Sequence, residues 1–141
     1  MSNETQEASQ ASSDAAPEKP AVGSIGWLDT TVADADGLRD FYAAVVGWQV
    51  HPMSMGDYDD YTMLDASGKP AAGVCHKRGK NADLPSGWLI YITVADLAAS
   101  LEACTAQGGT ILNPARQLGE YGQMAVIRDP SGGTLALFES A

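Results

Sequence analysis

The sequence predicts an α+β fold built from two copies of one βαβββ module, and three observations predict it. The segment Thr-Val-Ala-Asp occurs twice, at 31–34 and at 93–96. Each copy follows an apolar, β-branched stretch and precedes a segment with helical spacing. The chain has 141 residues and is 45% hydrophobic, which suits one domain with a substantial core. We expect this domain over residues 23–141, with modules at 24–79 and 86–141.

The internal repeat extends beyond this segment. The offset of 62 residues that aligns the two segments also places Gly47 on Gly109. Further along, Asp65-x-Ser-Gly matches Asp129-x-Ser-Gly at an offset of 64 residues, so the second module carries two extra residues before this motif. A repeat at a nearly fixed offset indicates one duplicated structural unit.

In the first module, residues 25–32 are rich in β-branched residues and are predicted to form a strand. Asp34 suits the N-cap of the following helix, and Gly47 suits its end, because glycine adopts the left-handed conformation readily. The helix has apolar residues at the spacing of one face: Leu38, Phe41, Tyr42, Val45 and Val46. Strands are then expected at about 48–52, 58–64 and 71–76, with a turn at Ser67-Gly68.

The second module has the same order of elements. Residues 88–94 are too apolar for a strand with one solvated face, so both faces must be covered. Asp96 suits the N-cap of a helix with Leu97, Leu101 and Cys104 on one face, ended by Gly108-Gly109. Strands are expected at about 110–114, 122–128 and 134–139, with a turn at Pro130-Ser131-Gly132 between the last two.

Residues 1–22 are predicted to form a disordered acidic tail. They contain almost no large apolar side chain whose burial would offset the entropy cost of ordering the backbone. The formal net charge of −10 opposes contact with nucleic acid and with anionic membranes. No stretch has the length or apolarity of a membrane span or a signal peptide. With only two cysteines, Cys75 and Cys104, the composition fits a reducing, cytoplasmic location.

Strand alternation predicts which side chains line a concave pocket. Ile90, Ile92 and Val94 should pack under a helix, which leaves a mixed set on the opposite face. That set is Leu89, Tyr91 and Thr93, together with their repeat equivalents Trp27, Asp29 and Thr31. Aromatic residues with a few polar groups are typical of a small-molecule pocket. Alternatively, Trp27 fills the concavity as core.

Residues 27–34 and 41–48 resemble the opening βα unit of the vicinal oxygen chelate (VOC) superfamily, which includes glyoxalases, bleomycin-resistance proteins and dioxygenases. Residues 128–139 are similar to the final hairpin of the same superfamily. The resemblance covers residues 24–140 and implies a curved mixed sheet around a concave pocket. Because members commonly form two-fold dimers, it also implies a homodimer. Members differ widely in function, so the resemblance is specific for the fold alone.

The resemblance also implies where metal-dependent members hold their ion. A His, Gln or Glu stands on each module's first strand, and a Glu or similar ligand stands on each last strand. The matching positions here are Trp27, Leu89, Ala136 and either Ala72 or Gly73. None of these side chains can ligate a divalent metal, so we expect no metal and no cofactor.

These considerations define the candidate site. The predicted ligand-binding residues are Trp27, Asp29, Thr31, Tyr61, Cys75, Leu89, Tyr91 and Phe138. The candidates for acid–base chemistry are Asp29, His76 and Tyr91. Strand parity leaves His76 open: if Ala72 faces the pocket then His76 does too, whereas if Gly73 faces it then Cys75 does instead.

Two functions fit these residues. The first is a metal-independent small-molecule-binding protein of the glyoxalase and bleomycin-resistance type, whose pocket takes an amphipathic or cationic ligand. The alternative is a VOC-type enzyme, a lyase, an isomerase or a glyoxalase-like protein, with Asp29 as base and His76 or Tyr91 as proton relay. A metal-dependent glyoxalase or dioxygenase ranks third because the ligands are missing, and a nucleophilic Cys75 ranks fourth.

Overall fold

The computed structural model describes residues 19–141. The predicted tail, residues 1–22, therefore lies outside the described residues except for its last four. Within residues 19–141, no helix is long and apolar enough to cross a membrane.

Two βαβββ modules follow one another along the chain, as predicted. The first comprises β1 (Ile25–Val32), α1 (Ala35–Val46), β2 (Gln49–Ser54), β3 (Asp59–Leu64) and β4 (Pro70–His76). A short 3₁₀ helix, η1 (Gly79–Asn81), lies in the connection. The second module comprises β5 (Trp88–Thr93), α2 (Leu97–Ala106), β6 (Thr110–Gln117), β7 (Gly122–Arg128) and β8 (Thr134–Ser140). The predicted fold class is confirmed.

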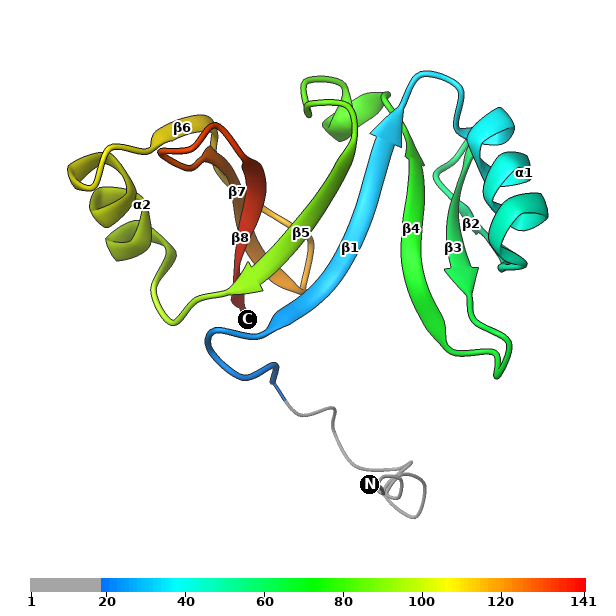
Figure 1. The fold of residues 1–141 in the computed structure, drawn as a ribbon, viewed down its shortest axis with the longest axis horizontal. Coiled ribbons are helices and arrows are strands. Elements are labelled where there is room, and N and C mark those ends of the chain that lie inside the picture. The colour runs from blue at the N-terminus through cyan, green and yellow to red at the C-terminus, as the bar shows by residue number, and fades with distance from the viewer. Residues whose placement is uncertain (1–18) are drawn as a thin grey trace, which may run out of the picture.

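All strands belong to one mixed eight-stranded sheet in the order β2-β3-β4-β1-β5-β8-β7-β6. The modules join in its centre, where β1 pairs antiparallel with β5. Parallel pairs flank this junction, β1 with β4 and β5 with β8, and the remaining pairs are antiparallel. Figure 1 shows the sheet strongly curved, with α1 on one flank and α2 on the other.

The helices cover one face of each half of the sheet. Under α1, the buried side chains of Tyr61, Met63 and Val74 pack against Ala35. Under α2, those of Ala125, Ile127 and Leu137 pack against Leu97. A third cluster lies on the opposite face, and its buried members are Leu84, Leu89, Tyr91, Met124, Val126 and Ala136. We call these two sides of the sheet the helix face and the cavity face.

Both predicted helix starts are confirmed. The Asp34 carboxylate accepts a hydrogen bond from Gly37 N at 2.9 Å, and the Asp96 carboxylate accepts one from Ala99 N at 3.1 Å. Such caps satisfy N–H groups that have no partner within the helix. Gly47 ends α1 in the left-handed conformation, with φ of 78°. The repeated sequence motifs therefore mark repeated local structures.

Candidate functional site

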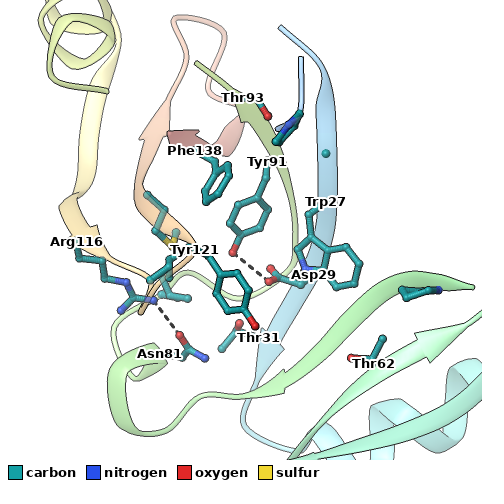
Figure 2. A pocket seen from close by; sticks show the side chains of 16 residues that line it. Trp27, Asp29, Thr31, Thr62, Asn81, Tyr91, Thr93, Arg116, Tyr121 and Phe138 are labelled. Carbon is teal, nitrogen blue, oxygen red and sulfur yellow. Dashed lines mark hydrogen bonds between the residues drawn. The ribbon is translucent and has the colours of Figure 1, made fainter. Parts of the chain in front are cut away.

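A cavity of about 720 Å³ lies on the cavity face, a volume within the range of small-molecule pockets. Strands β1 and β5 supply its centre, and β3, β4, β6, β7, β8 and the η1 connection supply its sides. Figure 2 shows side chains from these elements converging on one space. The lining residues are Pro20, Gly26, Trp27, Asp29, Thr31, Thr62, Pro70, Asn81, Leu84, Tyr91, Thr93, Arg116, Leu118, Tyr121, Met124 and Phe138.

Five of the predicted ligand-binding residues line this cavity: Trp27, Asp29, Thr31, Tyr91 and Phe138. The β1–β5 register explains why, since it pairs Trp27 with Tyr91 and so directs both side chains to the same face. The parallel β5–β8 register pairs Thr93 with Phe138 and extends the same face. The structure does not place Tyr61, Cys75 or Leu89 on the cavity wall.

Tyr61 lies on the helix face, one residue out of phase with the cavity. Its register partner is Val74, and the next residue of β3, Thr62, is the one that lines the cavity. The Tyr61 hydroxyl donates a hydrogen bond to Asp36 of α1 at 2.5 Å, and the Arg39 guanidinium lies over its ring. Placing Tyr61 in the pocket was therefore wrong by one step of strand alternation.

Leu89 and Cys75 lie on the cavity face but not on the cavity wall, and Leu89 is buried while Cys75 is partly exposed. Leu89 is a buried member of the cluster that packs under the cavity. Cys75 pairs in register with Thr31. Burial raises the pKa of its thiol, and the charges of Asp29 and Asp60 raise it further. A thiol with a raised pKa is a poor nucleophile, which argues against a nucleophilic Cys75.

His76 points away from the cavity, which settles the ambiguity of parity. Its register partner is Val32, and its ring Nδ1 lies 2.8 Å from the carbonyl oxygen of Asp59. Its Nε2 lies 3.6 Å from the carboxylate of Asp36 in α1. His76 therefore contacts the N-terminal turn of α1, and the prediction that it serves Asp29 as a proton relay is wrong.

Asp29 is the polar centre of the cavity. The Tyr91 hydroxyl donates a hydrogen bond to its Oδ2 at 3.0 Å. Burial raises the pKa of Asp29 from 3.8 to about 6, against the opposing effects of the Tyr91 hydrogen bond and of the neighbouring Trp27 indole. Burial, with the nearby Asp29 charge, also raises the pKa of Tyr91, so this phenol stays a hydrogen-bond donor. A carboxyl group that titrates near neutrality in a cavity is a candidate for binding or proton transfer.

The residues at the metal positions of VOC proteins do not fit a metal. Gly73 pairs with Asp29 as Ala136 pairs with Tyr91, so Gly73 and not Ala72 is the fourth position. A Cβ atom on Gly73 would lie 3.1 Å from Asp29 Cβ and 3.4 Å from Trp27 Cζ2. The Trp27 indole therefore lies directly over Gly73. Within residues 19–141, no group of three or more His, Cys, Asp and Glu residues could hold a metal ion.

Sequence reasoning missed the side of the cavity that β6 and the η1 connection supply. Arg116 donates hydrogen bonds to the carbonyl oxygen of Lys80 and, at 2.9 Å, to Asn81 Oδ1. It was missed because the strand was expected to stop at Pro114. One signal was available: Arg116 and Arg128 are the only basic residues after Lys80.

The paired modules, the curved sheet and the cavity between them define a protein of the VOC class. Comparison with known families agrees. The chain matches the family described as the glyoxalase-like domain over residues 27–138, and it belongs to that family.

Two curated relatives share this sequence pattern. CFP32 of Mycobacterium tuberculosis (strain CDC 1551 / Oshkosh), which is named as a glyoxylase, is 27% identical over 128 residues, covering 84% of this chain and 46% of that protein. The anthracycline biosynthesis protein DauV of Streptomyces sp. (strain C5) is 30% identical over 131 residues, covering 84% and 47%. The chain thus spans about half the length of the curated relatives it matches.

Solved structures share the fold at low sequence identity. A variant of methylmalonyl-CoA epimerase from Streptomyces coelicolor is 18% identical, with a TM-score of 0.52 over 86% of this chain and 99% of the other. A structure from Legionella pneumophila, described as an NAD-dependent benzaldehyde dehydrogenase, is 14% identical, with a TM-score of 0.54 over 82% and 98%. At this identity the likeness concerns the fold alone.

Proposed function

We propose that this protein binds a small molecule without a metal, in the manner of glyoxalase-like and bleomycin-resistance proteins, and that the cavity takes an amphipathic or cationic ligand. One observation carries the proposal: a carboxyl group with a raised pKa, Asp29, lies in a cavity whose other walls are largely aromatic and aliphatic. Ligand pockets commonly combine such apolar walls with a few placed polar groups.

The aromatic side chains supply flat surfaces for the apolar part of a ligand. Trp27, Tyr91 and Phe138 lie around the centre of the cavity (Figure 2). Tyr121, from the β6–β7 connection, is 72% exposed, so much of its ring is open to contact. Aromatic rings stack on flat or cationic groups, and they bury a large area at little entropic cost.

Asp29 supplies the polar contact. Above its pKa of about 6 it carries a negative charge, and a ligand ammonium or N–H group can neutralise that charge. The net charge of −10 raises the local concentration of cations around the whole protein. Both effects favour a ligand with a cationic or hydrogen-bond-donating group.

A second candidate function is metal-independent acid–base catalysis, and the hydrogen bond between Tyr91 and Asp29 favours it. A carboxylate with a pKa of about 6 can accept a proton near neutral pH. In this scheme Asp29 is the general base and the Tyr91 hydroxyl, 3.0 Å away, orients it and donates a hydrogen bond. A lyase or isomerase would use such a pair, and His76 has no part in it.

Further proposals concern the partner and the location. We propose a homodimer, because aromatic and aliphatic side chains on α1 and β5 are exposed: Phe41 is 53% exposed, Val45 61% and Trp88 38%. We propose a cytoplasmic location, because Cys75 and Cys104 are both free thiols.

Calorimetric titration with small aromatic probes and elemental analysis of the purified protein test the main proposal. We expect a naphthyl amine to bind in the cavity, and we expect no stoichiometric zinc, nickel, manganese or iron, because the four metal positions hold no donor. A tightly bound ion that only a chelator removes, with loss of probe binding, would contradict the proposal.

A further inference from the structure

Two buried side-chain atoms lack hydrogen-bond partners within residues 19–141, and both belong to cavity residues. One is the acceptor Asp29 Oδ1 and the other is the donor Arg116 Nε. A buried polar atom left unpaired costs roughly 1–3 kcal/mol, so nearly all such atoms in folded proteins are paired. The cavity therefore contains one unmet acceptor and one unmet donor.

Arg116 also lacks a counter-ion. Arg39 and Arg78 form ion pairs with Asp40 and Asp57 at 2.9 Å and 3.3 Å, but Arg116 forms none within the described part of the chain. A partly buried guanidinium is stabilised by a nearby anion, which no side chain of residues 19–141 supplies to Arg116 as an ion pair. Among residues 19–141, its side chain makes hydrogen bonds with Lys80 and Asn81 of the η1 connection alone.

The contacts with the η1 connection leave most of the guanidinium free. An arginine side chain has five N–H donors, and these contacts use one on each terminal nitrogen. The positive charge also acts across the cavity, since it offsets a small part of the rise in pKa that burial causes at Asp29 and Tyr91. Figure 2 shows Arg116 beside Asn81 and Asp29 beside Tyr91, on different sides of the space they line.

We infer that Arg116 is a ligand-binding residue that takes an acidic group, so that the ligand is a flat aromatic compound bearing a carboxylate or acidic phenol in addition to a donor group that meets Asp29. This inference rests on the proposed function and extends it from a cationic or amphipathic ligand to one with both kinds of polar group. A planar guanidinium suits a carboxylate because two parallel N–H bonds match its two oxygens.

Calorimetry with three probes that share one ring system tests this inference: naphthoate, naphthylmethanol and naphthylmethylamine. The wild type is compared with Arg116→Gln and with Arg128→Gln. Arg128 is exposed and lies outside the cavity, so its variant makes the same change in net charge without touching the site. Arg116→Lys keeps the charge and removes the planar fork, and it covers the case in which Arg116→Gln does not fold.

We expect Arg116→Gln to bind naphthoate at least about 10-fold more weakly than the wild type, the size of effect typical of a lost charge-assisted hydrogen bond. Naphthylmethanol should bind within about twofold of the wild-type value, because it makes no ionic contact. Naphthylmethylamine should bind equally or more tightly, because a competing cation is gone. Arg116→Lys should be intermediate for naphthoate, and Arg128→Gln should match the wild type.

Two results would overturn the inference and leave the proposed function standing. One is naphthoate binding that neither Arg116 variant weakens while the amine and alcohol still bind. The other is equal weakening of naphthoate by Arg116→Gln and Arg128→Gln, which would show an effect of net charge alone. If the wild type binds none of the three probes, the proposed function itself fails.

Discussion

Trp27 separates the two possible uses of the cavity face, as a working pocket or as filled core. Its indole covers Gly73 and packs against the cluster that contains Leu89 and Tyr91, yet one side lines the cavity. A fully buried tryptophan truncated to alanine costs about 3–5 kcal/mol of stability. A residue on a pocket wall should cost less, because part of its surface already contacts water.

We therefore expect Trp27→Ala to lower the free energy of unfolding by less than about 3 kcal/mol and to weaken probe binding by about tenfold or more. Urea denaturation and calorimetry measure the two effects. Trp48→Ala is the control, because Trp48 packs under α1, away from the cavity. It should lose stability and keep its probe affinity. Two results together would indicate that Trp27 is filled core: Trp27→Ala unfolds, and Trp27→Phe binds the probe as tightly as the wild type does.

Asp29 makes stability depend on pH in a direction opposite to that of most carboxylates. Its pKa is about 6 in the folded protein against an ordinary value of 3.8, so the folded state binds this proton more tightly than the unfolded state does. The resulting stabilisation is present at acid pH and is lost as the pH rises from about 4 through about 6, by at most about 3 kcal/mol.

Asp29→Asn should remove this dependence, because the amide keeps the shape and cannot titrate. The stability of the variant relative to the wild type should rise from pH 4 to pH 7 by up to about 3 kcal/mol. Binding of a naphthyl amine to the wild type should strengthen through about pH 6 and should not do so in the variant. Urea denaturation at several pH values gives the first result, and parallel curves for the two proteins would contradict it.

The residues in the centre of the site were predictable, and those at its sides were not. Trp27, Asp29 and Tyr91 followed from strand alternation and the repeat, because β1 and β5 are regular strands whose side chains alternate strictly. Tyr61 was misplaced because an aromatic side chain suits a pocket, while the sequence did not fix which face of its strand it points to. Arg116 and Asn81 come from segments that are far apart in the sequence. The contact between them depends on the path of the η1 connection.

Near the end of the last strand of each module lies a residue that contacts the N-terminal turn of that module's helix. Gly73 and Ala136 occupy equivalent positions, so His76 of β4 and Glu139 of β8 are equivalent too. His76 lies near Asp36 of α1, and the Glu139 carboxylate accepts a hydrogen bond from Leu97 N of α2 at 2.7 Å. The repeated position leads us to expect a structural role for His76.

We expect Glu139→Ala to lower the free energy of unfolding by about 1–2 kcal/mol, because it removes a charged acceptor from a helix N-terminus. Chemical denaturation measures the loss. The control is Glu102→Ala, which removes an exposed carboxylate from the middle of α2. If Glu139→Ala is as stable as Glu102→Ala, the contact between β8 and α2 contributes nothing to stability. The equivalent position of His76 would then give no reason to expect a stabilising contact there.

Strand β6 shows why an element boundary hid a functional side chain. The strand was predicted to end at about Pro114, a residue that cannot donate a ladder hydrogen bond. The strand continues to Gln117 because it lies at the edge of the sheet and its register shifts on both sides of Asn113. An edge strand with irregular register tolerates proline, and the extra residues carry Arg116 to the cavity.

At the scale of the whole molecule, the repeat predicted how many modules there are and left open how they meet. Their pairing within one chain follows from the antiparallel β1–β5 junction, which places one cavity between the two halves. Curated relatives are about twice as long as this chain.

Exposed apolar side chains on α1 and at the start of β5 form the surface where we expect a second copy to bind. The Trp88 indole donates a hydrogen bond to the Tyr42 hydroxyl at 2.9 Å, which joins β5 to α1, and the Phe41 ring packs edge-on against Tyr42. Phe41, Val45 and Trp88 are nevertheless 53%, 61% and 38% exposed. Clustered exposed apolar groups of this kind are typical of interaction surfaces.

We expect the wild-type protein to sediment with the mass of two chains, and Val45→Glu to sediment with the mass of one chain at the same concentration. The charge would be desolvated in the dimer and solvated in the monomer, so it should oppose association and leave the fold intact. Ile111→Glu is the control. Ile111 is also exposed, at 38%, but it lies on β6, the edge strand of the second module, whereas Val45 lies on α1 of the first module. The control should remain a dimer. A one-chain mass for the wild type at all concentrations would refute the dimer, and a Val45→Glu dimer would place its interface elsewhere.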